Sequence, residues 1–130
     1  MGKAVLIEKT VIDSILSYAK NFHPREGILL LRGKSDKYKI IVDDLLIPPF
    51  STHGYNFSNF PLHRLPIDFS IMGTAHSHPS GVLIPSIKDL NNFYGRIMVI
   101  LAYPYKSEQN MAVFDREGTP IKYAIIKSSP

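Results

Sequence analysis

The stretch that decides the fold covers residues 73–89, GTAHSHPSGVLIPSIKD. His76 and His78 are separated by one residue and follow an apolar run, which predicts the end of a β-strand. Because successive side chains of a strand point to opposite faces, both imidazoles are expected on one face. The turn chemistry of the next residues and a helix that begins near Ser86 would then bring Asp89 back toward the histidines.

His76, His78 and Asp89 form a candidate metal-binding set. Two imidazoles and one carboxylate, with a fourth position left to water, are typical of catalytic zinc, whereas structural zinc sites have four protein ligands and favour thiolates. The chain has no cysteine. A zinc ion here would lower the pKa of its bound water to about 7 and polarise a substrate carbonyl, so that an amide could be hydrolysed without a covalent intermediate. Such a mechanism also needs a general base.

Simpler interpretations exist for each of these residues. A single histidine is more often a surface or core residue than a metal ligand. Ser86 and Asp89 also match the capping box of a helix, which needs no metal. For Asp89 taken alone we favour capping, but the two histidines upstream reverse that preference. Both roles can coexist in one side chain.

Together these residues resemble the motif of the JAMM (MPN+) metalloprotease family. In that family a distant glutamate is followed by His-x-His-Pro and then by a serine and an aspartate at fixed spacing. The glutamate stands at the start of an apolar strand, seven residues before a glycine, which fits Glu26 and Gly33. Ten residues separate the second histidine from the aspartate, and the matching residues are His76, His78, Pro79, Ser86 and Asp89.

The resemblance implies an α/β fold: a single MPN domain of the cytidine-deaminase-like type, with a curved mixed β-sheet flanked by helices. It also implies that His76, His78 and Asp89 bind zinc. Glu26 would take a proton from the zinc-bound water and return it to the leaving amine, and Ser86 would donate a hydrogen bond to the developing oxyanion. The implied substrates are isopeptide or peptide bonds after the C-terminal tail of ubiquitin-like modifier proteins.

The assignment of the glutamate has one rival. Many family members carry Cys-Gly two and three residues after the glutamate, where this chain has Ile28 and Leu29. Glu8 is the nearest alternative to Glu26, but it precedes a predicted helix and lacks the apolar strand and the trailing glycine. Taken alone, Glu26 would be interpreted as an exposed carboxylate at the start of a strand.

Composition sets the outer limits of the function. At 130 residues the chain is expected to form one domain, residues 1–130, and its 45% hydrophobic content is ordinary for a globular protein. The absence of cysteine excludes a thiol nucleophile and fits a cytoplasmic protein. No apolar run approaches the roughly 20 residues of a membrane span, and no signal peptide is expected. The net charge of +4 is scattered along the chain, so nucleic acid is not expected as a partner.

An alternative function is a non-catalytic or partner-activated MPN scaffold, which would keep the fold without chemistry of its own. Such relatives usually lack a motif residue, whereas this chain has all of them. A homodimer or an assembly partner is compatible with either function. The compact form, without cysteine or large insertions, is typical of a prokaryotic family member, and an archaeal one is expected.

The rest of the chain predicts the elements around the motif. Residues 3–8 are expected to form an edge strand, and residues 10–21 a helix capped by Thr10 and Asp13. The aromatic stretch 50–66 is expected to close the core and, as the resemblance implies, to line a groove for the modifier tail. A helix over 86–93 is expected to bury Ile87, Leu90 and Phe93. The other expected strands are a hairpin of 28–31 and 38–46, and then 96–103, 110–114 and 121–126.

Overall fold

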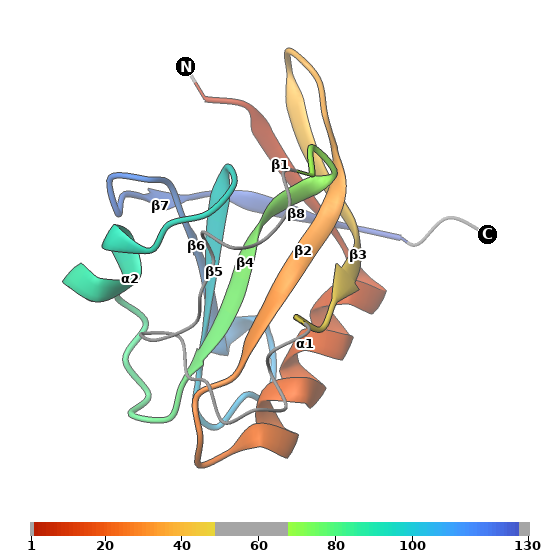
Figure 1. The fold of residues 1–130 in the computed structure, drawn as a ribbon. Coiled ribbons are helices and arrows are strands. Elements are labelled where there is room, and N and C mark those ends of the chain that lie inside the picture. Colours follow the sequence, from red (N-terminus) through yellow and green to blue (C-terminus); the bar gives the residue numbers. More distant parts are fainter. Residues whose placement is uncertain (1, 49–67, 128–130) are drawn as a thin grey trace.

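The computed structural model describes residues 2–48 and 68–127, and Figure 1 shows its fold. The stretch 50–66, with its expected groove, lies outside the described residues. Neither α-helix of the described part is long and apolar enough to cross a membrane. In chain order the elements are β1 (Ala4–Glu8), α1 (Lys9–Phe22), β2 (Ile28–Ser35), β3 (Lys39–Leu46), β4 (Ile71–His78), α2 (Ile87–Asn91), β5 (Ile97–Ala102), a 3-10 turn (Glu108–Asn110), β6 (Met111–Phe114), β7 (Pro120–Ile121) and β8 (Tyr123–Ile126).

The strands form one eight-stranded sheet in the order β7-β6-β5-β4-β2-β3-β1-β8. β1 runs parallel to β3 and to β8, and β4 runs parallel to β5, while the other neighbouring pairs are antiparallel. The predicted hairpin is confirmed by the pairing of β2 with β3. The curved, mixed sheet with helices is the α/β fold expected from the sequence (Figure 1).

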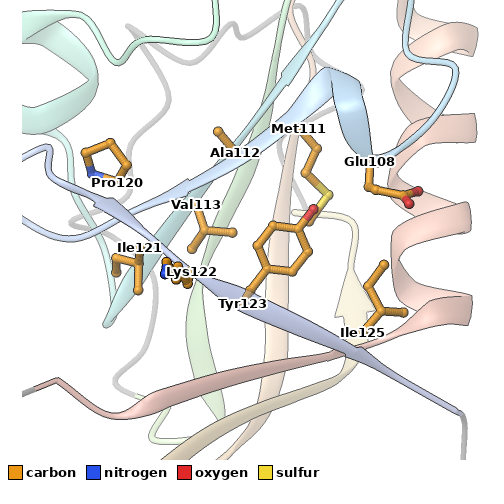
Figure 2. A pocket seen from close by; sticks show the side chains of 9 residues that line it. All are labelled: Glu108, Met111, Ala112, Val113, Pro120, Ile121, Lys122, Tyr123 and Ile125. Carbon is orange, nitrogen blue, oxygen red and sulfur yellow. The ribbon is translucent and has the colours of Figure 1, made fainter.

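The two ends of the sheet differ from the prediction. β1 is not an edge strand, since β8 pairs with its outer side. The edges are β7 and β8, and Lys122 alone separates them in the chain. The strand predicted over 121–126 is therefore two strands at opposite ends of the sheet, so the sheet must curl until its ends meet at Lys122. Next to this junction lies an open, mainly apolar groove of about 670 Å³ between β6 and β8, lined by residues that include Met111, Val113, Ile121 and Tyr123 (Figure 2).

α1 follows β1 directly and packs one stripe of side chains on the sheet. The buried residues of this stripe recur at helical spacing and are Val11, Ile12, Ile15, Leu16 and Ala19. The expected cap is wrong, because Glu8 is the N-cap and makes no side-chain capping bond. The chain enters the helix without a loop, so Thr10 already lies in the first turn. Asp13 instead accepts a hydrogen bond from Lys9 at 3.1 Å.

Apolar side chains cover both faces of the sheet. On the face toward α1, called here the α1 face, the cluster includes Leu29, Ala75 and Val99. On the opposite face, called the α2 face, the cluster consists of Ile28, Leu30, Ile71, Met98, Ile100 and Phe114. The first four residues of β2 and all of β5 are apolar, because successive side chains are buried on opposite faces of the sheet.

α2 is shorter than the helix expected over 86–93, and its orientation differs from the expected one. Ile87 is 79% exposed, so its expected burial is wrong, whereas Asp89 is only 6% exposed. Because consecutive helical residues are about 100° apart, Ile87 and Asp89 lie on nearly opposite sides of the helix and cannot both face the sheet. Phe93, just after the helix, packs against the α2 face as expected.

Gly33 stands at an irregularity of the central hairpin. The register of β2 and β3 shifts between Arg32 and Gly33. A Cβ atom on Gly33 would overlap the carbonyl oxygen of Ile41 on the neighbouring strand. The close approach of two backbones therefore requires the glycine that follows Glu26 after seven residues.

Candidate metal centre

The two histidines occupy the last residues of β4, in the middle of the sheet. His76 pairs with Ile28 of β2 and with Ile100 of β5, so its side chain lies on the α2 face. His78 lies on the same face because one residue separates the two. The ring centroids are 5.1 Å apart, and the rings are inclined by 67°. The geometry expected from the strand period is therefore present.

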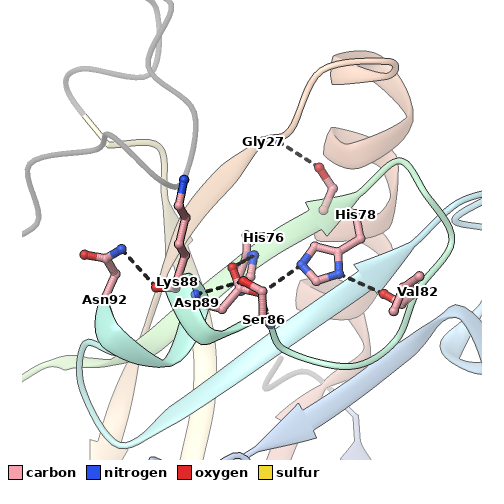
Figure 3. A network of polar contacts seen from close by, with 9 residues as sticks. Gly27, His76, His78, Val82, Ser86, Lys88, Asp89 and Asn92 are labelled. Carbon is pink, nitrogen blue, oxygen red and sulfur yellow. Dashed lines mark hydrogen bonds and ion pairs between the residues drawn. The ribbon is translucent and has the colours of Figure 1, made fainter.

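Asp89 reaches the histidines from the first turn of α2, as Figure 3 shows. Its Oδ2 atom lies 3.2 Å from Nε2 of His78, and its Oδ1 atom lies 3.8 Å from Nδ1 of His76. One ligand atom of each residue falls within 4.8 Å of the others. Among the described residues this is the group of histidine and acidic side chains that could hold a metal ion.

The same aspartate caps its own helix. The backbone N–H of Ser86 donates to Oδ2 of Asp89 at 2.7 Å, and the N–H of Asp89 donates to Oγ of Ser86 at 3.0 Å. Both halves of the capping box are thus present. The two interpretations of Asp89 coexist, because the box fixes the carboxylate in the orientation that faces the histidines.

The protonation of the three groups follows from their surroundings. Burial lowers the pKa of His76 to about 3, so this imidazole is neutral at neutral pH. Burial alone would raise the pKa of Asp89, but the hydrogen bond with His78 and the charge of His76, with the N–H of Ser86, lower it to about 2. Burial alone would lower the pKa of His78, but the Asp89 hydrogen bond and the Val82 carbonyl raise it.

The donor set fits a divalent ion such as zinc. Nδ1 of His78 lies 2.8 Å from the carbonyl oxygen of Val82, and since a carbonyl only accepts, this nitrogen carries the proton. The lone pair of Nε2 then faces the carboxylate of Asp89, and two acceptors at 3.2 Å require a proton or a cation between them. The Val82 carbonyl is the type of outer contact that orients a metal-binding histidine.

Glu26 and Ser86 line a cleft next to the candidate metal ligands. This cleft has a volume of about 520 Å³ and is lined by Glu26, His78, Ser86 and Asp89, together with apolar side chains that include Pro24, Val82 and Ile84. Oγ of Ser86 accepts the N–H of Asp89, which leaves the hydroxyl hydrogen available for donation. The structure therefore brings all five predicted site residues together.

Glu8, the rival of Glu26, lies elsewhere. It ends β1, which β2 and β3 separate from β4. Three steps across the sheet correspond to about 14 Å. Glu26 rather than Glu8 is therefore the glutamate beside the histidines.

Sequence reasoning assigned no role to Ser77 or to the Val82 carbonyl. Ser77 is 2% exposed, and its Oγ accepts the backbone N–H of Gly27 at 2.8 Å, next to Glu26. Its position between the two histidines was visible in the sequence, but its partner is 50 residues away in the chain. A backbone carbonyl leaves no signal in the sequence, because every residue has one.

Comparisons with known proteins agree with this geometry. The family model described as prokaryotic homologs of the JAB domain matches residues 8–116. A protein of Haloferax volcanii described as a probable metalloprotease is 33% identical over 123 residues, which cover 89% of this chain and 76% of that protein.

Solved structures are similar over nearly the whole chain. A JAB1/MPN domain protein from Archaeoglobus fulgidus has a TM-score of 0.71 and 32% identity, covering 93% of this chain and 98% of that one. A structure described as "JAMM: a metalloprotease-like zinc site in the proteasome and signalosome" has a TM-score of 0.70 and 30% identity, covering 96% and 100%. A Desulfitobacterium hafniense protein with 18% identity, a TM-score of 0.64 and coverage of 95% and 94% shares the fold.

These matches extend the similarity beyond the short motif to the sheet and helices that carry it. The family model alone spans most of the chain, from the last residue of β1 to the turn after β6. The resemblance to JAMM/MPN proteins is therefore confirmed, and this chain belongs to the family of prokaryotic homologs of the JAB domain.

Proposed function

We propose that this protein is a zinc-dependent peptidase that hydrolyses the bond after the C-terminal tail of ubiquitin-like modifier proteins. The observation that carries the proposal is the convergence of His76, His78 and Asp89 with Glu26 and Ser86 around one cleft. The likeness to a probable metalloprotease and to a JAMM zinc-site structure supports the metal-dependent peptidase. Zinc is inferred from the family and from the ligand set.

Glu26 and Ser86 have different roles in the proposed hydrolysis. When bound, a zinc ion supplies a water of lowered pKa and polarises the substrate carbonyl. Among the described residues that line the cleft, Glu26 is the one carboxylate besides Asp89. Glu26 accepts the proton of the attacking water and returns it to the leaving amine. The Ser86 hydroxyl, whose oxygen is already held by the N–H of Asp89, donates to the developing oxyanion.

The substrate class is proposed from the family resemblance and fits the surface beside the site. Val82 and Ile84 line the cleft and are 48% and 69% exposed. Exposed apolar side chains next to a catalytic cleft favour an extended polypeptide over a small polar molecule. The protein partner that this function requires is the modifier itself, joined to a lysine or to a following residue.

The test is the release of free modifier from an isopeptide-linked ubiquitin-like conjugate by the zinc-loaded protein. Replacing Glu26 by Gln should lower turnover by about 10²- to 10⁴-fold while the zinc content stays unchanged, because the base is lost and the ligands remain. The matched control is Glu117→Gln, which removes an exposed carboxylate in the turn that precedes β7. A chelated sample should be inactive.

Two outcomes would change the proposal. Full turnover by the Glu26→Gln variant would remove Glu26 from the mechanism. No release by the zinc-loaded wild type, on both isopeptide-linked and linear fusions, would favour the alternative of a partner-activated or non-catalytic scaffold.

A further inference from the structure

The side chain of Glu26 does not by itself fix the position of its carboxylate. It is exposed and lies two residues before the start of β2. Within the described part of the chain its carboxylate makes no hydrogen bond. A general base must nevertheless keep a fixed position, since misplacement by about 1 Å can cost about 100-fold in rate. The position of Glu26 must therefore come from the backbone next to it.

That backbone is held by Ser77 through two hydrogen bonds. The N–H of Ser77 donates to the carbonyl oxygen of Gly27 at 3.1 Å, as in a regular antiparallel pair. In a regular pair the N–H of Gly27 would donate to the carbonyl oxygen of Ser77. Here it donates to the side-chain Oγ of Ser77 at 2.8 Å instead. The side chain thus replaces the main chain as the acceptor where β2 separates from β4 toward Glu26.

Ser77 is placed for this role by the strand that carries the histidines. It lies between His76 and His78, and the strand period turns its side chain to the opposite face, toward α1. Ala75, two residues earlier, belongs to the cluster on that face. The hydroxyl is therefore directed away from the ligand atoms, and its contact with Gly27 transmits the position of β4 to Glu26.

Tyr18 packs on the same point from the α1 face, and a buried tyrosine with an unusual backbone conformation, Tyr105, belongs to the cluster on that face. A Cβ atom on Gly27 would lie 2.9 Å from Cε1 of Tyr18 on α1, so the helix packs tightly against this residue. Tyr105 is 1% exposed and has a φ of 60°, a conformation that tyrosine adopts only when its surroundings impose it. Burial raises the pKa of its phenol, with opposition from the Ser77 hydroxyl and a further increase from the charge of Glu26.

We propose that Ser77 is a positioning residue for Glu26: by accepting the N–H of Gly27, it fixes the proton-transferring carboxylate relative to the metal ligands of the same strand. This inference rests on the proposed function. It assigns Ser77 no contact with the metal or with the substrate.

The test compares Ser77→Ala, which removes the acceptor, with Ser77→Thr, which retains a hydroxyl. Ser77→Ala should lower kcat for modifier release by about 10- to 100-fold, with KM and the zinc dissociation constant within about threefold of the wild type. Ser77→Thr should restore kcat to within about threefold. The matched control is Thr74→Val, which removes a fully buried hydroxyl from the same strand and should leave kcat unchanged.

A double variant separates positioning from a general structural defect. If Ser77 acts through Glu26, adding Ser77→Ala to Glu26→Gln should cause no further loss of kcat, because the group being positioned is already gone. A multiplicative loss in the double variant would overturn the proposal. So would an unchanged kcat in Ser77→Ala, an equal loss in Thr74→Val, or a loss of kcat in proportion to lost zinc.

Two measurements decide the inference without any activity. Amide hydrogen exchange at Gly27 should accelerate about fivefold or more in Ser77→Ala, because its hydrogen bond is lost. With Mn²⁺ as the bound metal, paramagnetic relaxation of the Glu26 and Gly27 amide protons should weaken in Ser77→Ala, while that of Ser86 stays unchanged. If the wild type releases no modifier, the proposed function fails, and unchanged exchange and relaxation at Gly27 would overturn the role of Ser77 separately.

Discussion

The two faces of the sheet differ in what they contain. The α1 face is covered by the 14-residue helix α1 and an apolar cluster of nineteen buried residues. The α2 face has a cluster of six buried residues and a helix of five residues, whose inward side presents a carboxylate. The long amphipathic helix contributes stability, whereas the short capped helix positions a charge.

β4 belongs to both faces and shows why they can differ. Ala75 and Ser77 point toward α1, and His76 and His78 point toward α2. One strand therefore contributes to the main core with one set of residues and presents metal ligands with the other. The strand that carries the metal ligands is thus packed against α1 by its other residues, so mutations on the two faces should have separable effects.

The largest expected effect is the loss of stability from the α1 face. Ile15 belongs to α1 and is fully buried between this helix and the sheet, so Ile15→Ala should lower the free energy of unfolding by about 2–5 kcal/mol through lost burial and the cavity left behind. Urea unfolding of the metal-free protein measures this change. The zinc affinity of the folded variant should stay within about threefold. A parallel loss of zinc affinity would mean that the two faces are not separable.

At Asp89 we expect the opposite result, a loss of zinc affinity with little loss of stability. Asp89→Asn keeps an oxygen that can accept the N–H of Ser86, so the cap survives, but the charge that attracts the metal is lost. Zinc affinity should fall by about 100-fold or more, with little change in the melting temperature of the metal-free protein. Competition titration with a zinc chelator measures the first, and calorimetry the second. Unchanged zinc affinity would leave Asp89 with the capping role alone.

The decrease in the free energy of unfolding at low pH should reflect the burial of His76. Its folded pKa of about 3 lies below the ordinary value of 6.5. Below pH 6.5 the unfolded chain takes up a proton that the folded chain cannot bind, so this residue lowers the free energy of unfolding by about 1.4 kcal/mol per pH unit as the pH falls toward 3. The stability is fully present above pH 6.5.

Urea unfolding of the chelated protein between pH 6 and pH 4.5 tests this slope. His76→Gln should reduce this slope by about 1.4 kcal/mol per pH unit, which corresponds to one proton. His78 has the opposite sign, since its raised pKa contributes stability below pH 6.5 that is lost as the pH rises through that pKa. An unchanged slope in His76→Gln would contradict the buried neutral imidazole.

The smallest effect on the free energy of unfolding is expected on the exposed side of α1. Lys9 and Asp13 form an exposed i,i+4 ion pair at 3.1 Å. Asp13→Asn should change the free energy of unfolding by no more than about 0.5 kcal/mol, and less at high salt, because water screens the pair. Urea unfolding at low and high salt measures it. A loss of more than about 1 kcal/mol would mean that Asp13 caps the helix after all.

Much of the fold could be predicted because its signals are local. The strand period before His78, the apolar runs of β2 and β5 and the helical spacing of α1 each lie within one segment. The errors occurred where distant segments decide. β1 is not an edge because β8, more than 100 residues later, pairs with it. The segment 121–126 is split because the curled sheet uses its two halves at opposite ends.

In the candidate site, too, local geometry could be predicted from the sequence, whereas contacts that form only on folding could not. The histidines and the Ser86 to Asp89 spacing could be predicted, since a strand and the first turn of a helix set their local geometry. The choice between capping and facing the histidines could not be made from spacing, because the same carboxylate does both. Ile87 was expected to be buried from its apolar side chain, but the inward orientation of Asp89 turns it outward.

The sequence by itself determined which groups this protein can use: two imidazoles, a carboxylate, a serine and no thiol, at spacings that strand and helix geometry convert into a cluster. Only the tertiary structure decided that Glu26 rather than Glu8 lies beside them, that Ser77 holds Gly27, and that the Val82 carbonyl fixes the proton of His78. The physical reason is that spacing along the chain sets the direction of a side chain, whereas burial, protonation and backbone contacts depend on segments that meet only after folding.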